Sequence, residues 1–354
     1  MNEPRLRIDQ AGALATLQDA GRPGLRRLGV PGSGILVPPL MAIANRLAGN
    51  GPDNPVIEAF GPGLRLTALA GPVRLGLAGA LTARRLGPQG EEALKGWRSL
   101  TLAEGESLRI DALLAGRLAV VAVAGLALPP QLGSVSTYTR ARLGGLTGGP
   151  LTTGDTLPAG PTPVGPDWAL ARPWTPEAGP IRVIPGPQDD HFTPEALATF
   201  LAAQYRLTPE ADRMGLRLAG PALAHRPGRA EIVSDGTVPG AIQVPGNGAP
   251  IVLLADGQTA GGYPKIATVI QADLPRLAWS APGTALSFQA VSLAQARQAA
   301  QRQTAELEAL LAGTVPLIHG EVDAAALYRE NLVGGAIHAL APEYRPLTTD
   351  PGEP

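Results

Sequence analysis

Short apolar runs separated by turn residues make up most of this sequence. The runs are rich in Leu, Val and Ala, and the 45 Gly and 37 Pro are spread along the chain rather than gathered in one tail. Frequent turns between short apolar runs favour a β-sandwich or barrel over a helical bundle. The pattern therefore predicts a mainly β protein with a few short helices and a C-terminal helix.

The apolar runs predict several strands in the first half of the chain. Residues 5–17 read as a first strand or hairpin. Leu118–Leu128 is the longest apolar run, but it is too short to cross a bilayer, which needs about 20 residues. We therefore expect it to form a buried strand. Glu58 sits inside a predicted strand, and we expect it to be half buried. The shorter predicted strands are VIEAF, GLRLTAL, VRLGLAG, SLTL and SLRI.

Three segments have helical periodicity and capping residues. PPLMAIANRLAGN begins at Pro38 and ends before Gly49, with an apolar stripe on one face. TPEALATFLAAQY begins after Thr193 as N-cap, and a long surface helix is expected from Ser292 to Ala312. A shorter helix, VDAAALYRENL, is predicted next, and the final TTDPGEP is expected to be disordered.

A glycine-rich stretch in the second half carries the strongest turn signals. Asp256-Gly257 follows the apolar run IVLLA and predicts a tight hairpin, since both positions of such a turn must accept positive φ. The pair Gly261-Gly262 could present bare backbone N–H groups to a ligand. From Lys265 we expect a strand with Ile266, Thr268 and Ile270 on one face.

Lysine is rare in this chain. There are 27 arginines but only Lys95 and Lys265. A lysine kept beside a Gly-Gly turn can serve as a compact charge with a tunable pKa, which arginine lacks. The alternative is that Lys265 is an edge-strand residue with no special role.

Two further segments are too rich in Gly and small residues for regular structure. Gln18–Gly34 must be a shaped loop, in which Asp19, Arg22 and Ser33 could line a site or, for Asp19 and Ser33, make only local turn hydrogen bonds. The second segment groups small polar side chains: Ser134, Ser136, Thr137 and Tyr138.

Length and proline spacing predict two lobes. Because most domains contain about 100–200 residues, a chain of 354 residues is expected to form about two domains. Proline recurs every few residues from Pro158 to Pro187, where we place the connection. The predicted organisation is an N-terminal β lobe over residues 1–165, a barrel lobe over 166–313 and a C-terminal extension over 314–354.

Composition argues against several classes of function. The net charge of −1 gives no basic field for nucleic acid, and the absence of cysteine removes disulfides and thiolate chemistry. The four histidines are isolated, so no metal site is expected. With no signal peptide or apolar span, we expect a cytoplasmic protein without a membrane partner.

Polar side chains in the second lobe are the candidates for chemistry. Arg213 or Lys265 could hold a carboxylate or phosphate, and Asp235 or Asp212 could act as a general base. We assign Arg213, Asp235 and Lys265 as catalytic. The side-chain amides of Gln243 and Gln258 suit a lactam or urea-like substrate. The predicted substrate-binding residues are Asp212, Gln243, Gln258, Thr259 and Tyr263.

For each candidate an ordinary structural role stays open. Asp212-Arg213 could be a surface ion pair, and Asp235-Gly236 could be a turn. Tyr263 could be a packing residue. There is no phosphate-binding loop of the Walker type, no nucleophile elbow, and no lysine placed for biotin attachment.

Several blocks together resemble one protein family: QDAGRPG, GSVSTYTRARLGG, GPQDDHF, ADRMGLRLAGP, SDGTVPGAIQVPGNG and GGYPKIATVI. They are similar to the KipA-like, or allophanate-hydrolase-subunit-2-like, family. That family includes the C subunit of bacterial ATP-dependent 5-oxoprolinase and the second half of the urea carboxylase carboxyltransferase domain. The resemblance covers roughly residues 10–290 and implies a β fold of cyclophilin-like barrel character.

The resemblance also implies function. It suggests an ATP-dependent lactam hydrolase, with ATP and Mg at the level of a complex that contains two partner proteins, one KipI-like and one LamB/YcsF-like. Alternatives are a carboxyltransferase served by a biotinylated partner, or a non-enzymatic antagonist that binds a KipI-like kinase inhibitor. Val37 stands where the family usually has Asp, so the second lobe carries our site predictions.

Overall fold

The computed structural model describes residues 3–317, 335–338 and 341–346, and its contacts divide the chain into two units, Met1–Pro316 and Leu317–Pro354. In the second unit, β24 (Gly335–His338) and β25 (Ala341–Pro346) pair antiparallel. The helix predicted in VDAAALYRENL and the tail TTDPGEP lie outside the described residues. All of the site residues predicted from the sequence belong to the first unit.

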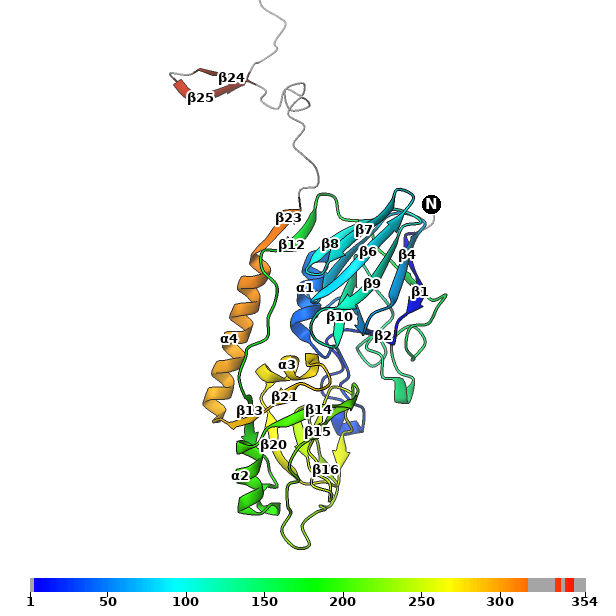
Figure 1. Cartoon of the computed structure of the whole chain (residues 1–354). Coiled ribbons are helices and arrows are strands. Elements are labelled where there is room, and N and C mark those ends of the chain that lie inside the picture. The colour runs from blue at the N-terminus through cyan, green and yellow to red at the C-terminus, as the bar shows by residue number, and fades with distance from the viewer. Residues whose placement is uncertain (1–2, 318–334, 339–340, 347–354) are drawn as a thin grey trace, which may run out of the picture. The chain divides into compact units, whose positions relative to one another are not determined.

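Residues 3–170, here called the first half, form two sheets, and strand β23 from the end of the unit joins one of them (Figure 1). The six-stranded sheet has the order β11-β1-β4-β9-β6-β7 and the seven-stranded sheet has the order β2-β3-β10-β5-β8-β12-β23. The six strands are β11 (Thr156–Pro158), β1 (Arg5–Ala11), β4 (Leu64–Leu69), β9 (Ser107–Leu113), β6 (Leu81–Gly87) and β7 (Gly90–Lys95). The seven are β2 (Leu14–Gln18), β3 (Val56–Phe60), β10 (Leu118–Val123), β5 (Val73–Ala78), β8 (Arg98–Leu102), β12 (Asp167–Leu170) and β23 (Thr314–Leu317).

Residues 181–290, here called the second half, form a barrel-like sheet of eight strands, in the order β21-β14-β15-β18-β17-β20-β13-β22. They are β21 (Ala285–Leu286), β14 (Tyr205–Ala211), β15 (Gly215–Ala219), β18 (Ile251–Leu253), β17 (Ala241–Gln243), β20 (Lys265–Val269), β13 (Ile181–Pro185) and β22 (Phe288–Ala290). A small ladder, β16 (Asp235–Gly236) with β19 (Ala260–Gly261), stands beside it. The prediction of a mainly β fold with barrel character is confirmed.

Four helices accompany the sheets: α1 (Pro38–Ala48), α2 (Pro194–Ala202), α3 (Leu274–Trp279) and α4 (Leu293–Ala312). The caps predicted for α1 and α2 are present, with Gly49 left-handed after α1 and Thr193 accepting from the backbone N–H of Ala196. Ser292 and Gln295 form a capping box at α4. Among the described helices none has the length and apolar character that crossing a bilayer requires.

Strand β10 is shared by two hydrophobic cores. Ala119, Val121 and Val123 face the core between the two first-half sheets, whereas Leu118 and Val120 face a second core. That second core also contains the apolar stripe of α1 and barrel residues from β13, β15, β17, β18 and β20. One continuous apolar interior therefore joins the two halves.

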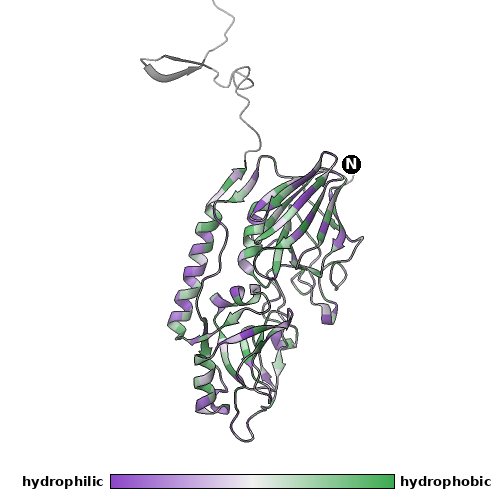
Figure 2. Ribbon diagram, in the orientation of Figure 1, coloured by the Kyte–Doolittle hydropathy of each residue, from purple (hydrophilic) through white to green (hydrophobic). Residues whose placement is uncertain are grey.

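A close approach between α1 and β5 fixes the helix on the sheet. A Cβ added to Gly76 would lie 2.0 Å from the carbonyl oxygen of Ala44, so only glycine is accommodated there. Figure 2 shows hydrophobic residues along the first-half strands, whereas α4 carries many hydrophilic residues. Only Ala299 and Leu310 of α4 are buried, in agreement with its predicted place on the surface.

Three expectations from the sequence differ from the structure. The hairpin predicted at Asp256-Gly257 is wrong, because β17 lies between β18 and β20 in the sheet. Neither Asp256 nor Gly257 has a positive φ, and the Asp256 side chain is taken up by an ion pair. Glu58 is fully buried rather than half buried.

The third difference concerns the strand from Lys265. It ends at Val269, and a bulge opposite Ile242 and Gln243 interrupts its alternation, so that Ile266 and Ala267 both enter the core.

Candidate functional site

Two adjoining hollows form a cleft between loops of the two halves, here called the two-part cleft. The larger hollow, of about 550 Å³, lies against β14, β15, β17 and β18. The smaller, of about 260 Å³, reaches β2 and Tyr138 of the first half. Both are lined by Arg140, Asp212 and Met214, so these residues stand where the two hollows meet.

The bend between β14 and β15 is fixed by Asp212. Its Oδ1 accepts hydrogen bonds from the backbone N–H groups of Met214 (2.7 Å) and Gly215 (3.0 Å). This is the local turn bonding typical of aspartate. The carboxylate is thereby held at the wall of the cleft, at the position shared by the two hollows.

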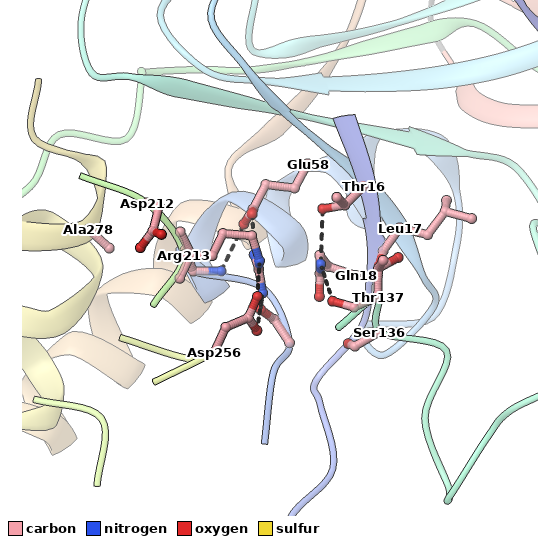
Figure 3. A network of polar contacts seen from close by, with 12 residues as sticks. Thr16, Leu17, Gln18, Glu58, Ser136, Thr137, Asp212, Arg213, Asp256 and Ala278 are labelled. Atoms are coloured by element: carbon pink, nitrogen blue, oxygen red, sulfur yellow. Dashed lines mark hydrogen bonds and ion pairs between the residues drawn. The ribbon is translucent and has the colours of Figure 1, made fainter. Parts of the chain in front are cut away.

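Arg213 lies next to Asp212 but points into the protein (Figure 3). Its Nε donates to Asp256 (2.9 Å), its Nη1 to Glu58, and its Nη2 to the carbonyl oxygen of Gly34 (2.6 Å). Glu58 also accepts from the backbone N–H of Leu36 (2.8 Å). Burial lowers the pKa of Arg213, but the charges of Glu58 and Asp256 outweigh it and the net shift is upward.

Because Glu58 and Leu36 belong to the first half and Asp256 to the second, this buried ion network ties the halves together. Most of the N–H groups of Arg213 are used by protein acceptors. Arg213 borders the smaller hollow, yet its contacts are those of a residue that positions the cleft wall.

Gln243 and Gln258 meet in the larger hollow together with Tyr263. Gln258 Nε2 donates to Gln243 Oε1 over 2.7 Å. A Cβ on Gly261 would lie 2.5 Å from Gln243 Nε2, which explains one glycine of the Gly-Gly pair by close packing. Four of the five predicted substrate-binding residues, Asp212 among them, are thus brought to one surface.

Lys265 and Asp235 form a separate contact outside the two-part cleft. Lys265 Nζ is 2.8 Å from Asp235 Oδ2, and the side chain of Gln188 bonds to Asp235 (3.3 Å) and to the backbone N–H of Lys265 (3.2 Å). The hydrogen bond from Lys265 holds the pKa of Asp235 below its usual value. Neither hollow of the cleft is lined by Lys265, Asp235 or Thr259.

The Lys265–Asp235 pair instead fastens a flap, defined as residues 232–237 and 257–262. Asp235 pairs with Gly261 in the ladder of β16 and β19, and the N–H of Thr237 donates to the carbonyl oxygen of Thr259 (3.0 Å). The flap carries Gln258 to the cleft, and Tyr263 follows it directly. On its other side Arg26 of the first half donates to the carbonyl oxygen of Gln258 (2.6 Å).

First-half residues of the cleft were not among the predicted site residues. Thr16, Tyr138, Thr139 and Arg140 line it, and Gln18 donates to Thr16 Oγ1 (2.9 Å) and to the carbonyl oxygen of Thr137 (3.2 Å) beside it (Figure 3). The signal was present in the polar cluster before Tyr138 and in the STYTRARLGG motif. The second half carried the predictions because Val37, buried and without a capping side chain, replaces the expected Asp.

The cleft offers amides, hydroxyls and charges of both signs rather than a metal centre. Among residues 3–317, no group of three or more His, Cys, Asp or Glu side chains is placed to hold an ion. Such a surface can bind a small polar molecule by hydrogen bonds from amides and arginine.

Comparison with known proteins places this geometry in a family. The model for "Carboxyltransferase domain, subdomain A and B" matches residues 28–290. The chain is 36% identical to the C subunit of the 5-oxoprolinase of Escherichia coli (strain K12) over 306 residues, which cover 86% of this chain and 97% of that protein.

Longer proteins are also similar. The urea amidolyase of Lachancea kluyveri is 27% identical over 343 residues, covering 89% of this chain but 18% of that protein. The crystal structure of TTHA0988 is 35% identical with a TM-score of 0.71, over 81% of this chain and 56% of that one. This chain thus spans little more than half of that solved chain.

Proposed function

The chain belongs to the family of the carboxyltransferase domain, subdomain A and B, and from this premise we propose that it is the C subunit of an ATP-dependent 5-oxoprolinase. The supporting observation is the 36% identity to a 5-oxoprolinase C subunit, which extends over nearly the whole length of that relative. In this proposal the chain acts in the cytoplasm with a KipI-like partner and a LamB/YcsF-like partner. The complex opens 5-oxoproline to glutamate.

The two-part cleft is the site that we assign to this activity. A lactam has one carbonyl acceptor and one N–H donor, which the paired amides of Gln243 and Gln258 can match. Asp212 and Tyr263 border the same hollow and complete the proposed contacts. Arg213 positions the wall, and Lys265 with Asp235 positions the flap, so their effect on catalysis is indirect.

We assign ATP and Mg to the complex rather than to the cleft. The cleft carries carboxylates as well as arginines, and the sequence has no phosphate-binding loop of the Walker type. The nucleotide is therefore expected on one of the partner proteins or where two proteins of the complex meet.

Reconstitution tests the proposal. The purified chain is combined with its KipI-like and LamB/YcsF-like partners, and consumption of 5-oxoproline is followed with and without ATP. Turnover that needs all three proteins together with ATP is expected. A folded chain that forms the complex but yields no glutamate would refute the assignment.

A carboxyltransferase is the second candidate, favoured by the 27% identity to urea amidolyase. The same preparation is offered a carboxylated biotin carrier and urea. Carboxyl transfer, together with inactivity on 5-oxoproline, would select this alternative.

A further inference from the structure

We propose that Arg140, contributed by the first half, binds the carboxylate of the substrate in the two-part cleft. This inference rests on the proposed function and deepens it, since 5-oxoproline carries one carboxylate beside its lactam. Arg140 lies at the junction of the two hollows. A ligand whose lactam meets Gln243 and Gln258 would thus extend toward it.

The charges around the cleft leave Arg140 uncommitted. Asp256 is paired with Arg213, and Asp212 accepts two backbone N–H groups. Glu210 and Arg217 line the same hollow with opposite charges. Within the described part of the chain, Arg140 itself makes no hydrogen bond or ion pair, and its side chain is exposed. Arg217 is exposed as well but lines only the larger hollow, so Arg140 is the cation at the junction that can accept an anionic ligand.

The loop that carries Arg140 is held by a buried arginine and a half-buried aspartate. Arg22 is only 1% exposed. Its guanidinium donates to the carbonyl oxygens of Gln131 (3.1 Å) and Ser136 (2.5 Å). Asp19 accepts from the hydroxyls of Ser134 (2.5 Å) and Ser136 (2.5 Å). Burying the charge of Arg22 to shape one loop is costly, which indicates that the exposed tip of the loop has a function.

The tip itself is closed by tight backbone contacts. Tyr138 and Leu143 exchange backbone hydrogen bonds of 2.7 and 3.2 Å across the turn that holds Arg140. Gly144 has φ +72°, and a Cβ there would lie 2.0 Å from the carbonyl oxygen of Ser136. The backbone under Arg140 is therefore held in place before a ligand arrives, which lowers the entropy cost of binding.

Arginine suits this role because its planar fork makes two parallel hydrogen bonds to a carboxylate. The smaller hollow adds the hydroxyls of Thr16 and Tyr138 and the apolar side chains of Leu14 and Met214. These groups would lie beside the carboxylate of a ligand whose lactam occupies the larger hollow. Urea has no carboxylate, so an arginine in this role separates the two candidate functions.

The test compares two lactams in the reconstituted complex. Arg140→Gln should lower kcat/KM for 5-oxoproline by about 10- to 100-fold, mainly through KM, because a charged hydrogen bond is lost. For 2-pyrrolidinone, which lacks the carboxylate, the same variant should match the wild type. Arg140→Lys should recover part of the loss, and Arg142→Gln, a nearby exposed arginine that lines neither hollow, should behave as wild type.

Unchanged kinetics on 5-oxoproline in Arg140→Gln, or an equal loss on both lactams, would overturn the assignment of Arg140. If the wild-type complex does not turn over 5-oxoproline, the proposed function fails instead. Arg140 is then judged by calorimetric titration of the chain with 5-oxoproline. Binding lost in Arg140→Gln but kept in Arg142→Gln supports the inference, whereas no binding to the wild type, or equal binding to all variants, contradicts it.

Discussion

Arg213 shows how much one buried side chain can organise. Its guanidinium holds Glu58 from one half and Asp256 from the other, both with side chains 5% exposed or less. Removing one member of a buried ion network leaves an unpaired charge in the interior, which strongly destabilises the folded state. Replacing the whole network by apolar side chains changes the stability much less.

Arg213→Met should therefore destabilise the protein by about 3–5 kcal/mol, since it strands two buried carboxylates. Chemical denaturation with the intact chain measures this loss. The triple variant Glu58→Gln, Arg213→Met, Asp256→Asn should recover part of it because no charge is left buried. A matched control, Arg85→Met at an exposed ion pair with Glu92, should change little.

Asp19 gives a prediction about pH. Burial raises its pKa, but hydrogen bonds from Ser134, Ser136, Val135 and Gly21 outweigh burial and bring the pKa below 3.8. A depressed folded-state pKa means that stability is present above the unfolded value and lost as the pH falls through the folded one. Denaturation between pH 5 and pH 2 should show a shallower acid loss in Asp19→Asn than in the wild type. Parallel curves would contradict this.

At the scale of elements, the flap links one ion pair to the cleft. Lys265→Met should release the flap, because Asp235 then loses the partner that tethers β16. We expect faster hydrogen exchange at Thr237 and Gly261 and a higher KM for 5-oxoproline. Lys95→Met provides the control, since Lys95 is exposed at the end of β7. Unaltered exchange in Lys265→Met would remove the positioning role.

The two glycines of the flap should respond differently to alanine. A Cβ at Gly261 would collide with Gln243 Nε2 at 2.5 Å, whereas at Gly262 the nearest atom is 3.4 Å away. Gly261→Ala should therefore disturb the Gln243–Gln258 hydrogen bond and lower kcat/KM, and Gly262→Ala should be tolerated. Equal activities would show that the glutamine pair is not part of the site.

Elements with strong local signals were predictable from the sequence. The caps of α1, α2 and α4 are local chemistry, and β10 is apolar on both faces. The hairpin of β6 and β7 was missed because its residues, LTARRLGPQGEEALK, are largely polar at the edge of a sheet. Helix α3 was missed because it is only six residues long.

The candidate site was predictable only in part, because its assembly depends on long-range contacts. Asp212, Gln243, Gln258 and Tyr263 lie on one surface, but the sequence could not show that Arg213 turns toward Glu58, 155 positions away. Lys265 was predicted to be functional because lysine is rare in this chain, but that rarity does not predict which carboxylate the side chain contacts. The assignment of roles to these residues stays a prediction.

At the scale of the whole molecule, the segments on the two sides of residue 165 share a sheet and a hydrophobic core. The core around α1 also contains barrel residues, and β12 and β23 join the first-half sheet from either side of the barrel segment. We therefore expect one cooperative calorimetric transition for Met1–Pro316. Two resolved transitions would mean that the halves fold independently.

The two-sided burial of β10 bears on how such a chain can be cut or fused. A fragment ending before the barrel would expose Leu118, Val120 and the apolar face of α1 to solvent, and we expect it to aggregate. Extra modules should be tolerated at the ends but not at the midpoint. Engineering of this protein, and of longer polypeptides that contain the same module, should therefore treat it as an indivisible block.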